Sequence, residues 1–247
     1  MCRLFAVHAT KPFQLAAPFE GLARLSTSHK DGWGVAKFDG AWELERSTLP
    51  AHASPRFAQL GAEPSGDVTL AHIRWASVGA AQDMNNQHPF VGNGWVFMHN
   101  GTLTNFDASR AKLEAEIAPE FRIGLKGTTD SERCFALFLT FLQGRSDVEV
   151  PEAARALTRV MNLAAATCDE PGGYQRSSMN FIASNGKITV ATRRGQTLFS
   201  NQGKDAVSLS STNSLFAADR WEQVPEDGVL AIDDTLKPFK SSIVDWR

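Results

Sequence analysis

Met1-Cys2-Arg3-Leu4-Phe5-Ala6-Val7 opens the chain and sets a cysteine directly before an apolar segment, Leu4–Val7, that we expect to form a strand. Methionine aminopeptidases remove Met1 when the second side chain is small, and cysteine qualifies. The processed protein would then begin with Cys2 and carry a thiol beside a free α-amine. Because such an amine has a reference pKa of about 7.7–8.0, much of it is neutral near pH 7 and can accept a proton. A thiol with its own base is an activated nucleophile; the alternative is that Cys2 merely reflects the context of the start codon.

Length and composition are those of an ordinary soluble globular protein. Of the 247 residues, 43% are apolar and 21% are charged, which is typical of a chain that buries a core without disulfides or metals. The net charge of −2 gives no electrostatic reason to expect binding to nucleic acid or to an anionic membrane. Because no repeat, low-complexity tract or flexible linker marks a boundary, we expect a single domain over residues 1–247.

The three cysteines, Cys2, Cys134 and Cys168, predict free thiols and no disulfide framework, because they are odd in number and far apart. The N-terminus lacks the continuous apolar segment of a signal peptide. The longest apolar run, Cys134–Leu142, is too short to span a bilayer. These features predict a protein of the reducing cytoplasm.

Short strand patterns separated by turn signals dominate much of the chain. Asp39-Gly40 and Asn185-Gly186 are turn pairs typical of tight hairpins, and strand patterns flank each of them. The expected strands are Leu4–Val7, Gly34–Phe38, Trp42–Arg46, Val68–Arg74, Trp95–His99, Met179–Ser184, Lys187–Ala191, Thr197–Ser200, Val207–Ser210 and Gly228–Ile232.

Helix patterns lie between these strands. Phe13–Ser26 places its leucines and Phe19 on one face, which predicts an amphipathic helix. Thr129–Glu132 is a capping-box pattern before a second helix, Ser131–Leu142, whose apolar residues on nearly every side predict burial. Pro151 suits the first turn of a third helix. Helices in mid-chain between groups of hairpin-linked strands predict an α+β fold of antiparallel sheets covered by helices.

Several polar segments interrupt the apolar patterns, and each has an ordinary structural explanation as a turn, a solvated charge or a helix cap. Together they supply the groups that acyl transfer on a small amino-acid amide requires. The segments are HKDGWG at 29–34, AHIRWAS at 71–77, NNQHPF at 85–90, HNGTL at 99–103 and TTDSE at 128–132.

The residues of these segments fit specific chemical roles beside a nucleophilic Cys2. The side chain of Asn100 and the backbone N–H of Gly101 can donate hydrogen bonds to a tetrahedral oxyanion. Arg74 suits a substrate α-carboxylate, because the guanidinium group is planar and binds carboxylates through two hydrogen bonds. Asp130, at a helix start, is a candidate for binding an α-ammonium group. A site that binds both charges of an amino acid leaves the reacting bond in the side chain of the substrate.

These segments resemble the motifs of class II glutamine amidotransferase domains, which belong to the N-terminal nucleophile (Ntn) hydrolase superfamily. The opening Met-Cys-Arg-Leu, HKDGWG, HIRWAS, HNG and TDSE follow in the family's order from Cys2 to about Leu142, and the hairpins after Met179 are similar to the second half of its small stand-alone members. The resemblance implies a four-layer αββα sandwich with two stacked antiparallel sheets. It also implies hydrolysis of glutamine to glutamate and ammonia through a γ-glutamyl thioester on Cys2.

The resemblance implies the same roles for Arg74, Asp130, Asn100 and Gly101 that their chemistry suggests. It adds a further set of expected substrate-binding residues, which line the pocket or a closing loop: Trp75, Ser77 and His99. One departure is Ser77-Val78, where the large synthase-linked members have Thr-His, so any contact from Val78 must come from its main chain.

His29 has no role implied by the resemblance. It could contact the leaving group of the substrate. Alternatively, Asp31 and Gly32 could simply shape a turn beneath the nucleophile.

No metal or other cofactor is expected, because the six histidines show no HxxxH or HxxE ligand spacing. Three functions remain open. The protein could release ammonia from glutamine for a separate acceptor enzyme, since no synthase module is visible. It could hydrolyse a larger γ-glutamyl amide, as some stand-alone relatives do in thiol biosynthesis. It could also be an inactive amino-acid-binding or interaction module.

Overall fold

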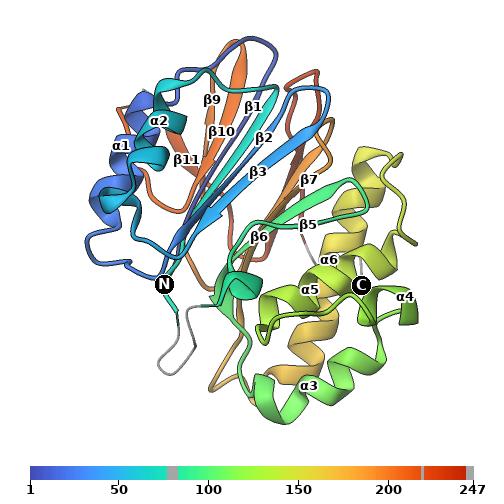
Figure 1. Ribbon diagram of the computed structural model, residues 1–247. Helices are drawn as coiled ribbons and strands as arrows, with labels where there is room; N and C mark the ends of the chain where they lie inside the picture. Colours follow the sequence, from blue (N-terminus) through green and yellow to red (C-terminus); the bar gives the residue numbers. More distant parts are fainter. Residues whose placement is uncertain (77–82, 218–219, 243–247) are drawn as a thin grey trace.

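The computed structural model describes residues 1–76, 83–217 and 220–242, and it shows two stacked antiparallel sheets with helices on both outer faces (Figure 1). In the described residues, one sheet has seven strands in the order β11-β9-β10-β1-β4-β2-β3. The other sheet has six strands in the order β13-β12-β8-β7-β6-β5. The α+β, four-layer αββα sandwich expected from the sequence is confirmed.

Both sheets combine distant parts of the chain. The first consists of β1 (Arg3–Ala9), β2 (Trp33–Phe38), β3 (Trp42–Ser47), β4 (Val68–Ile73), β9 (Phe199–Gln202), β10 (Ala206–Ser210) and β11 (Trp221–Gln223). The second consists of β5 (Phe90–Gly92), β6 (Trp95–Thr102), β7 (Ser178–Ser184), β8 (Thr189–Arg193), β12 (Gly228–Ile232) and β13 (Phe239–Ser242).

The helices form the two outer layers. The first sheet is covered by α1 (Ala16–Leu25) and α2 (Pro55–Ala62), and the second carries α3 (Phe106–Ala115), α4 (Pro119–Arg122), α5 (Asp130–Phe141) and α6 (Val150–Cys168). Two short 3-10 turns, Ala51–Ala53 and Met84–Asn86, lie in the connections. No helix in the described ranges is both long and apolar enough to cross a lipid bilayer.

Alternating side chains of the central strands explain the four layers. In β1, Leu4 and Ala6 pack into the core between the two sheets, whereas Phe5 and Val7 pack into the core beneath α1 and α2. In β6, Val96 and Met98 face the core between the sheets, whereas Trp95 and Phe97 face the core beneath α5 and α6. Because successive side chains of a strand point to opposite faces, a strand that is apolar at every position must be covered on both sides.

The two hairpins and the buried helix predicted from the sequence are confirmed. Gly40 and Gly186 adopt positive φ angles of 73° and 89° in the turns that join β2 to β3 and β7 to β8. Helix α5 is buried continuously from Ser131 to Leu139. The third helix, α6, carries Pro151 in its first turn as expected.

Several predicted boundaries are wrong, because tertiary hydrogen bonds compete with local preference. Helix α1 begins at Ala16, since Gln14 forms a β-bridge with Pro64. Strand β8 begins only at Thr189, because the main-chain N–H groups of Lys187 and Ile188 donate hydrogen bonds to the side chain of Asn185. Strand β6 runs on to Thr102, and β9 is displaced toward Gln202. The sequence analysis also missed α2, α3, α4 and the short strands β5, β11 and β13.

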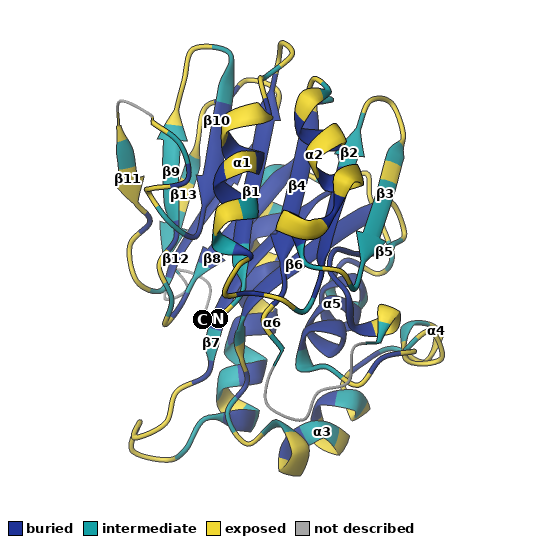
Figure 2. Ribbon diagram, turned by 60° about the vertical axis from the view of Figure 1, so that its left-hand side comes forward, coloured by how far each residue is buried: buried dark blue, intermediate teal, exposed yellow. Residues whose placement is uncertain are grey.

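Four chain segments meet at one end of the sandwich. The start of β1 pairs with the end of β4, where Arg3 lies opposite Ile73. Across the sheets, Nε2 of His72 lies 3.3 Å from the main-chain oxygen of His99 in β6. The start of α5 is tied to the end of β6, because the N–H of Leu103 donates to Asp130 at 2.7 Å. Figure 2 shows the N-terminus at this lower end of the two buried sheets.

Candidate active site

A cavity of about 720 Å³ opens where these segments meet. Its walls come from the N-terminus, residues 74–76, the end of β6, the first turns of α3 and residues 128–131. Cys2, Arg74, Gly101 and Asp130 all line it, as do Trp75 and His99. The structure thus brings together six residues that are spread over residues 2–130 of the chain.

Cys2 lies half-buried at the base of this cavity. Its Sγ accepts the main-chain N–H of Trp75 at 3.4 Å and lies 3.6 Å from the carbonyl oxygen of the same residue. Burial raises the pKa of the Cys2 thiol, while the Trp75 main chain, the amino terminus and Arg74 partly oppose the shift. A thiol with a raised pKa is mostly protonated at neutral pH, so it needs a nearby base to become a nucleophile.

Arg74 is held by its main chain and left unpaired at its side chain. Its N–H donates to Gly32 at 2.9 Å, and its carbonyl oxygen accepts the N–H of Asp31 at 3.3 Å. The residue is 4% exposed, and Nη1 is buried without a hydrogen-bond partner. Within the described residues, the guanidinium has neither an ion pair nor a hydrogen bond. A buried, unpaired cation is costly unless a ligand supplies the counter-charge.

Asp130 provides the opposite charge on the same cavity. Its Oδ2 accepts the N–H of Leu103 and its Oδ1 accepts the N–H of Ser131, both at 2.7 Å. These bonds fix the carboxylate, but no lysine or arginine in the described ranges pairs with it. Arg74 and Asp130 therefore present a positive and a negative group to one space, as binding of an amino-acid zwitterion requires.

His99 supports this wall without neutralising Asp130. Its Nε2 lies 3.0 Å from the carbonyl oxygen of Ser178, which can only accept, so we assign the ring proton to Nε2. Its Nδ1 lies 2.9 Å from the hydroxyl of Ser131 and 4.0 Å from Oδ1 of Asp130. Burial lowers the pKa of His99 despite the opposing effect of Asp130. A neutral His99 leaves the Asp130 charge available to a ligand.

Asn100 and Gly101 lie within strand β6, paired with Asn180 and Met179 of β7. Gly101 lines the cavity, and a Cβ atom there would run into the carbonyl oxygen of Ser178 and the ring of His99. Asn100 is 2% exposed, its Oδ1 has no hydrogen-bond partner, and the residue is not part of the cavity lining. The close packing at residue 101 therefore requires glycine.

Comparisons with known proteins identify the family of the chain. The family model "Glutamine amidotransferases class-II" matches residues 1–202. The chain belongs to the class II glutamine amidotransferases. It is 30% identical over 205 residues to the "Putative glutamine amidotransferase" of Haemophilus influenzae, which covers 77% of this chain and 62% of that protein.

Two further relatives bear on fold and chemistry. A solved glutamine aminotransferase class-II domain protein from Silicibacter pomeroyi is 26% identical, with a TM-score of 0.68 over 98% of this chain and 99% of that one. The "Gamma-glutamyl-hercynylcysteine sulfoxide hydrolase" of Mycobacterium tuberculosis is 29% identical over 183 residues, or 73% of this chain and 66% of that protein. The amidotransferase chain thus spans about two thirds of the length of two of these relatives.

The HKDGWG segment of this amidotransferase is hydrogen-bonded to residues 74–76, which form one wall of the cavity. The Asp31 carboxylate accepts the N–H of Ala76 at 2.8 Å, and the Asp31 carbonyl accepts the side-chain amide of Gln87 at 2.6 Å. His29 does not line the cavity, but its ring packs edge-on against that of Trp75 at 4.8 Å. Trp75 itself is 48% exposed at the rim.

The expected contribution of Ser77 lies outside the described residues, as does that of Val78. The opposite wall of the amidotransferase cavity is formed by α3, a helix that was not predicted from the sequence. Arg110 lies over the ring of Phe106 at 4.9 Å and donates to the carbonyl oxygen of Thr128 at 3.2 Å. The helical spacing of Phe106, Leu113 and Ile117 was the signal available for this helix.

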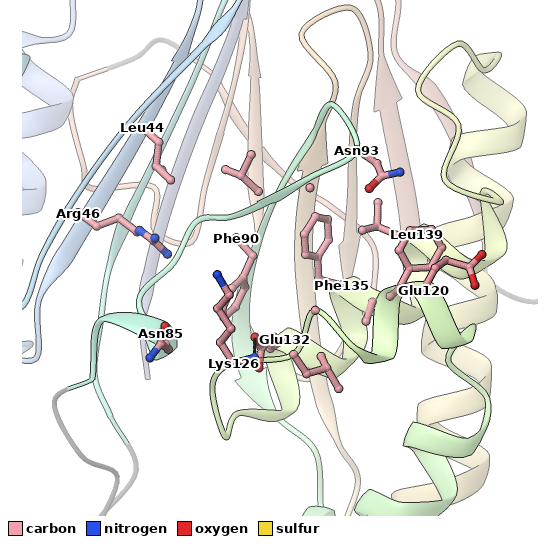
Figure 3. Close-up of a pocket in the computed structure, with 16 residues that line it drawn as sticks. Leu44, Arg46, Asn85, Phe90, Asn93, Glu120, Lys126, Glu132, Phe135 and Leu139 are labelled. Atoms are coloured by element: carbon pink, nitrogen blue, oxygen red, sulfur yellow. Dashed lines mark hydrogen bonds between the residues drawn. The ribbon is translucent and has the colours of Figure 1, made fainter.

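A second cavity, of about 360 Å³, lies on the other side of residues 126–132 (Figure 3). Phe90, Phe135 and Leu139 form its apolar part. Its cations, Arg46 and Lys126, are matched in number by Glu120 and Glu132. Among the described residues its lining includes no cysteine and carries no net charge, whereas the first cavity is lined by Cys2. In the described residues no cluster of three histidine, cysteine, aspartate or glutamate side chains could hold a metal ion.

Proposed function

We propose that this enzyme hydrolyses the side-chain amide of glutamine, with Cys2 as the nucleophile after Met1 has been removed. The observation that carries the proposal is that Arg74, which has no side-chain partner in the described residues, and Asp130, which no lysine or arginine there neutralises, line one cavity with the Cys2 thiol. Arg74 would bind the α-carboxylate of glutamine and Asp130 its α-ammonium group. This orientation places the side chain of the substrate as the part left to reach the thiol.

The proposed reaction starts with transfer of the thiol proton to the α-amine of Cys2. The thiolate then attacks the amide carbon, and the Gly101 N–H on the cavity wall stabilises the oxyanion together with the side-chain amide of Asn100, which is adjacent to Gly101 in β6 but outside the cavity lining, at about 3–4 kcal/mol for each such donor. The protonated amine gives its proton to the departing nitrogen, and ammonia leaves. Water hydrolyses the thioester by the same route and releases glutamate. Because burial raises the pKa of the thiol, the reaction depends on this base.

The test compares the intact mass of the purified protein with its release of glutamate and ammonia. Activity should require loss of Met1, and both Cys2→Ala and Cys2→Ser should abolish or severely reduce it. Covalent labelling of Cys2 by a glutamine-like diazo-ketone should block activity with a stoichiometry of one label per chain. Full activity in Cys2→Ala would end the proposal.

A second candidate is hydrolysis of a larger γ-glutamyl amide. The cavity volume of about 720 Å³ favours it, since pockets of roughly 300–1,000 Å³ hold drug-sized ligands and a free amino acid is smaller. The Mycobacterium tuberculosis relative is named for such an activity. A panel of γ-glutamyl amides beside glutamine separates the two: a preference for glutamine supports the first function and a preference for larger amides supports the second.

We infer two further properties from the chemistry. Ammonia released from glutamine would be lost unless it were captured, so the first function implies a separate acceptor enzyme. The three cysteines are free thiols, which supports a reducing cytoplasmic location. An inactive binding module is the weakest alternative, because an idle module would not need a thiol on the same cavity as the two charges; absence of any labelling by the diazo-ketone would favour it.

A further inference from the structure

His29 is the one histidine of the HKDGWG segment, and it is buried, with 2% of the residue exposed and its ring packed against Trp75. Its Nδ1 lies 2.7 Å from the carbonyl oxygen of Leu25. A carbonyl oxygen can only accept a hydrogen bond, so Nδ1 carries the ring proton. The hydroxyl of Ser28, 3.0 Å from the same nitrogen, can accept as well. The other nitrogen, Nε2, is therefore the one with the free lone pair.

Nε2 of His29 has no hydrogen-bond partner in the described residues, although it is fully buried. An acceptor nitrogen in this state is costly, unless a group that is present in the active protein donates to it. The unpartnered nitrogen is therefore able to accept a hydrogen bond from a donor that the described residues do not supply.

The surroundings of His29 show which group could complete the site. The ring packs edge-on against Trp75, whose N–H donates to Sγ of Cys2. Nη1 of Arg3 lies 3.2 Å from the carbonyl oxygens of both Met1 and Cys2. The pKa of His29 is shifted by the amino terminus, by Arg3 and by the main chain of Met1. The imidazole thus packs on Trp75, on the side where the main chain of Met1 influences the ring.

Burial, together with nearby positive charges, keeps the His29 ring neutral. Burial is the largest effect and lowers the pKa of His29, and Arg3 and the amino terminus lower it further. The carbonyl groups of Leu25 and Met1 act in the opposite direction. No carboxylate is among these neighbours, so the ring remains an acceptor at neutral pH.

Cleavage of the Met1–Cys2 peptide bond leaves a free amine on the α-carbon of Cys2, at the position of the present amide nitrogen. We propose that Nε2 of His29 accepts an N–H hydrogen bond from this amine and so positions it as the base for the Cys2 thiol. The inference rests on the proposed function, because it concerns the same nucleophile. His29 is a positioning residue and transfers no proton itself.

The proton balance is simple. The amine lone pair takes the proton from Sγ and becomes an ammonium group, whose N–H bond to His29 is then charge-assisted. The same proton goes on to the leaving nitrogen of the substrate, and the amine returns to its neutral form. A neutral acceptor stabilises the charged amine, so His29 raises the pKa of the Cys2 amine above the value that burial alone would leave.

Two substitutions separate the two nitrogens of the ring. His29→Gln places an amide oxygen near the position of Nε2, whereas His29→Asn can replace only the Nδ1 donor. We expect kcat to fall about 10- to 100-fold in His29→Asn, as expected for loss of a hydrogen bond to a charged group, and to stay within about threefold of wild type in His29→Gln. KM should change little in either variant, because His29 does not line the cavity.

The pH profile of kcat/KM provides a readout that a purely structural role would not move. In His29→Asn the acidic limb should shift to lower pH by about one unit, because the charged amine loses its acceptor; in His29→Gln it should stay in place. Equal losses in both variants, or an unshifted limb in His29→Asn, would overturn the inference.

Measurements on the wild-type protein keep the test independent of how the variants fold. The ¹⁵N resonance of His29 Nε2 should titrate with the same midpoint as the acidic limb, and a resonance that ignores this midpoint contradicts the inference. Wild-type protein without Met1 that releases no glutamate from any γ-glutamyl amide would instead refute the proposed function. Activity that depends on Cys2 but not on His29 would refute only the positioning role.

Discussion

Replacing Arg74 with methionine should stabilise the free protein while it weakens substrate binding. The guanidinium is 4% exposed and has no partner in the described residues, so the folded state bears the cost of an unsatisfied buried cation. An unsatisfied buried donor costs about 1–3 kcal/mol, and more when it is charged. Arg74→Met removes this cost and keeps a similar apolar volume. We therefore expect the free energy of unfolding to rise by about 1–3 kcal/mol, with about 2–4 °C in Tm for each kcal/mol.

Binding should change in the opposite direction. Loss of one partner from a buried, hydrogen-bonded charge pair costs about 2–5 kcal/mol, which corresponds to an increase of about 30-fold or more in KM. Glutamate, the product, should raise the Tm of wild type but not that of Arg74→Met. The two assays are thermal unfolding with and without glutamate and initial rates over a range of glutamine concentrations.

Arg194 offers a matched control for the same substitution. It is equally buried, at 6% exposed, but its Nη2 lies 2.6 Å from Asp169. Arg194→Met should lower the free energy of unfolding by about 3 kcal/mol, because it leaves Asp169, whose side chain is only 14% exposed, without its cation. If Arg74→Met lost stability to the same extent, or bound glutamine as wild type does, the assignment of Arg74 as an unpaired carboxylate receptor would be wrong.

Three further predictions follow from the contacts behind the cavity. Gly101→Ala should lower both kcat and stability, by about 1–3 kcal/mol for the latter, because its Cβ meets the Ser178 carbonyl; a rate and a Tm equal to wild type would show that β6 and β7 can separate there. Asp31→Ala should reduce kcat/KM by about tenfold or more through loss of the bond to Ala76, while Asp31→Asn, which retains an acceptor, keeps most of it; equal rates in the two variants would contradict this. Burial lowers the pKa of His72 from its ordinary 6.5 to about 3. Between these two pH values the unfolded chain binds a proton that the folded chain does not. The free energy of unfolding should therefore fall by up to about 1.4 kcal/mol per pH unit as the pH drops from 6.5 toward 3. Urea unfolding at pH 7, 6, 5 and 4 tests this, with a shallower slope expected for His72→Gln.

Local chemistry was sufficient for much of the fold. The turn pairs at Gly40 and Gly186 are visible in the sequence, because positive φ angles are a property of single residues. The apolar strands and the buried helix α5 are visible for the same reason, since their pattern repeats over a few residues. Boundaries such as the start of α1 were not, because the bridge between Gln14 and Pro64 joins residues fifty positions apart.

The amino-acid order alone named the thiol, the two charged side chains and the Asn100-Gly101 pair, because each carries its chemistry in its own functional groups. Only the tertiary structure decided that the Arg74 side chain has no partner within the described residues, that α3 closes the far side of the cavity, and that His29 packs on Trp75. These facts depend on contacts between segments that the chain sets far apart. Burial of Arg74, and its lack of a counter-charge among the described residues, arise only when the two sheets and their helices pack together, and they bring reactive side chains from separate segments to one cavity.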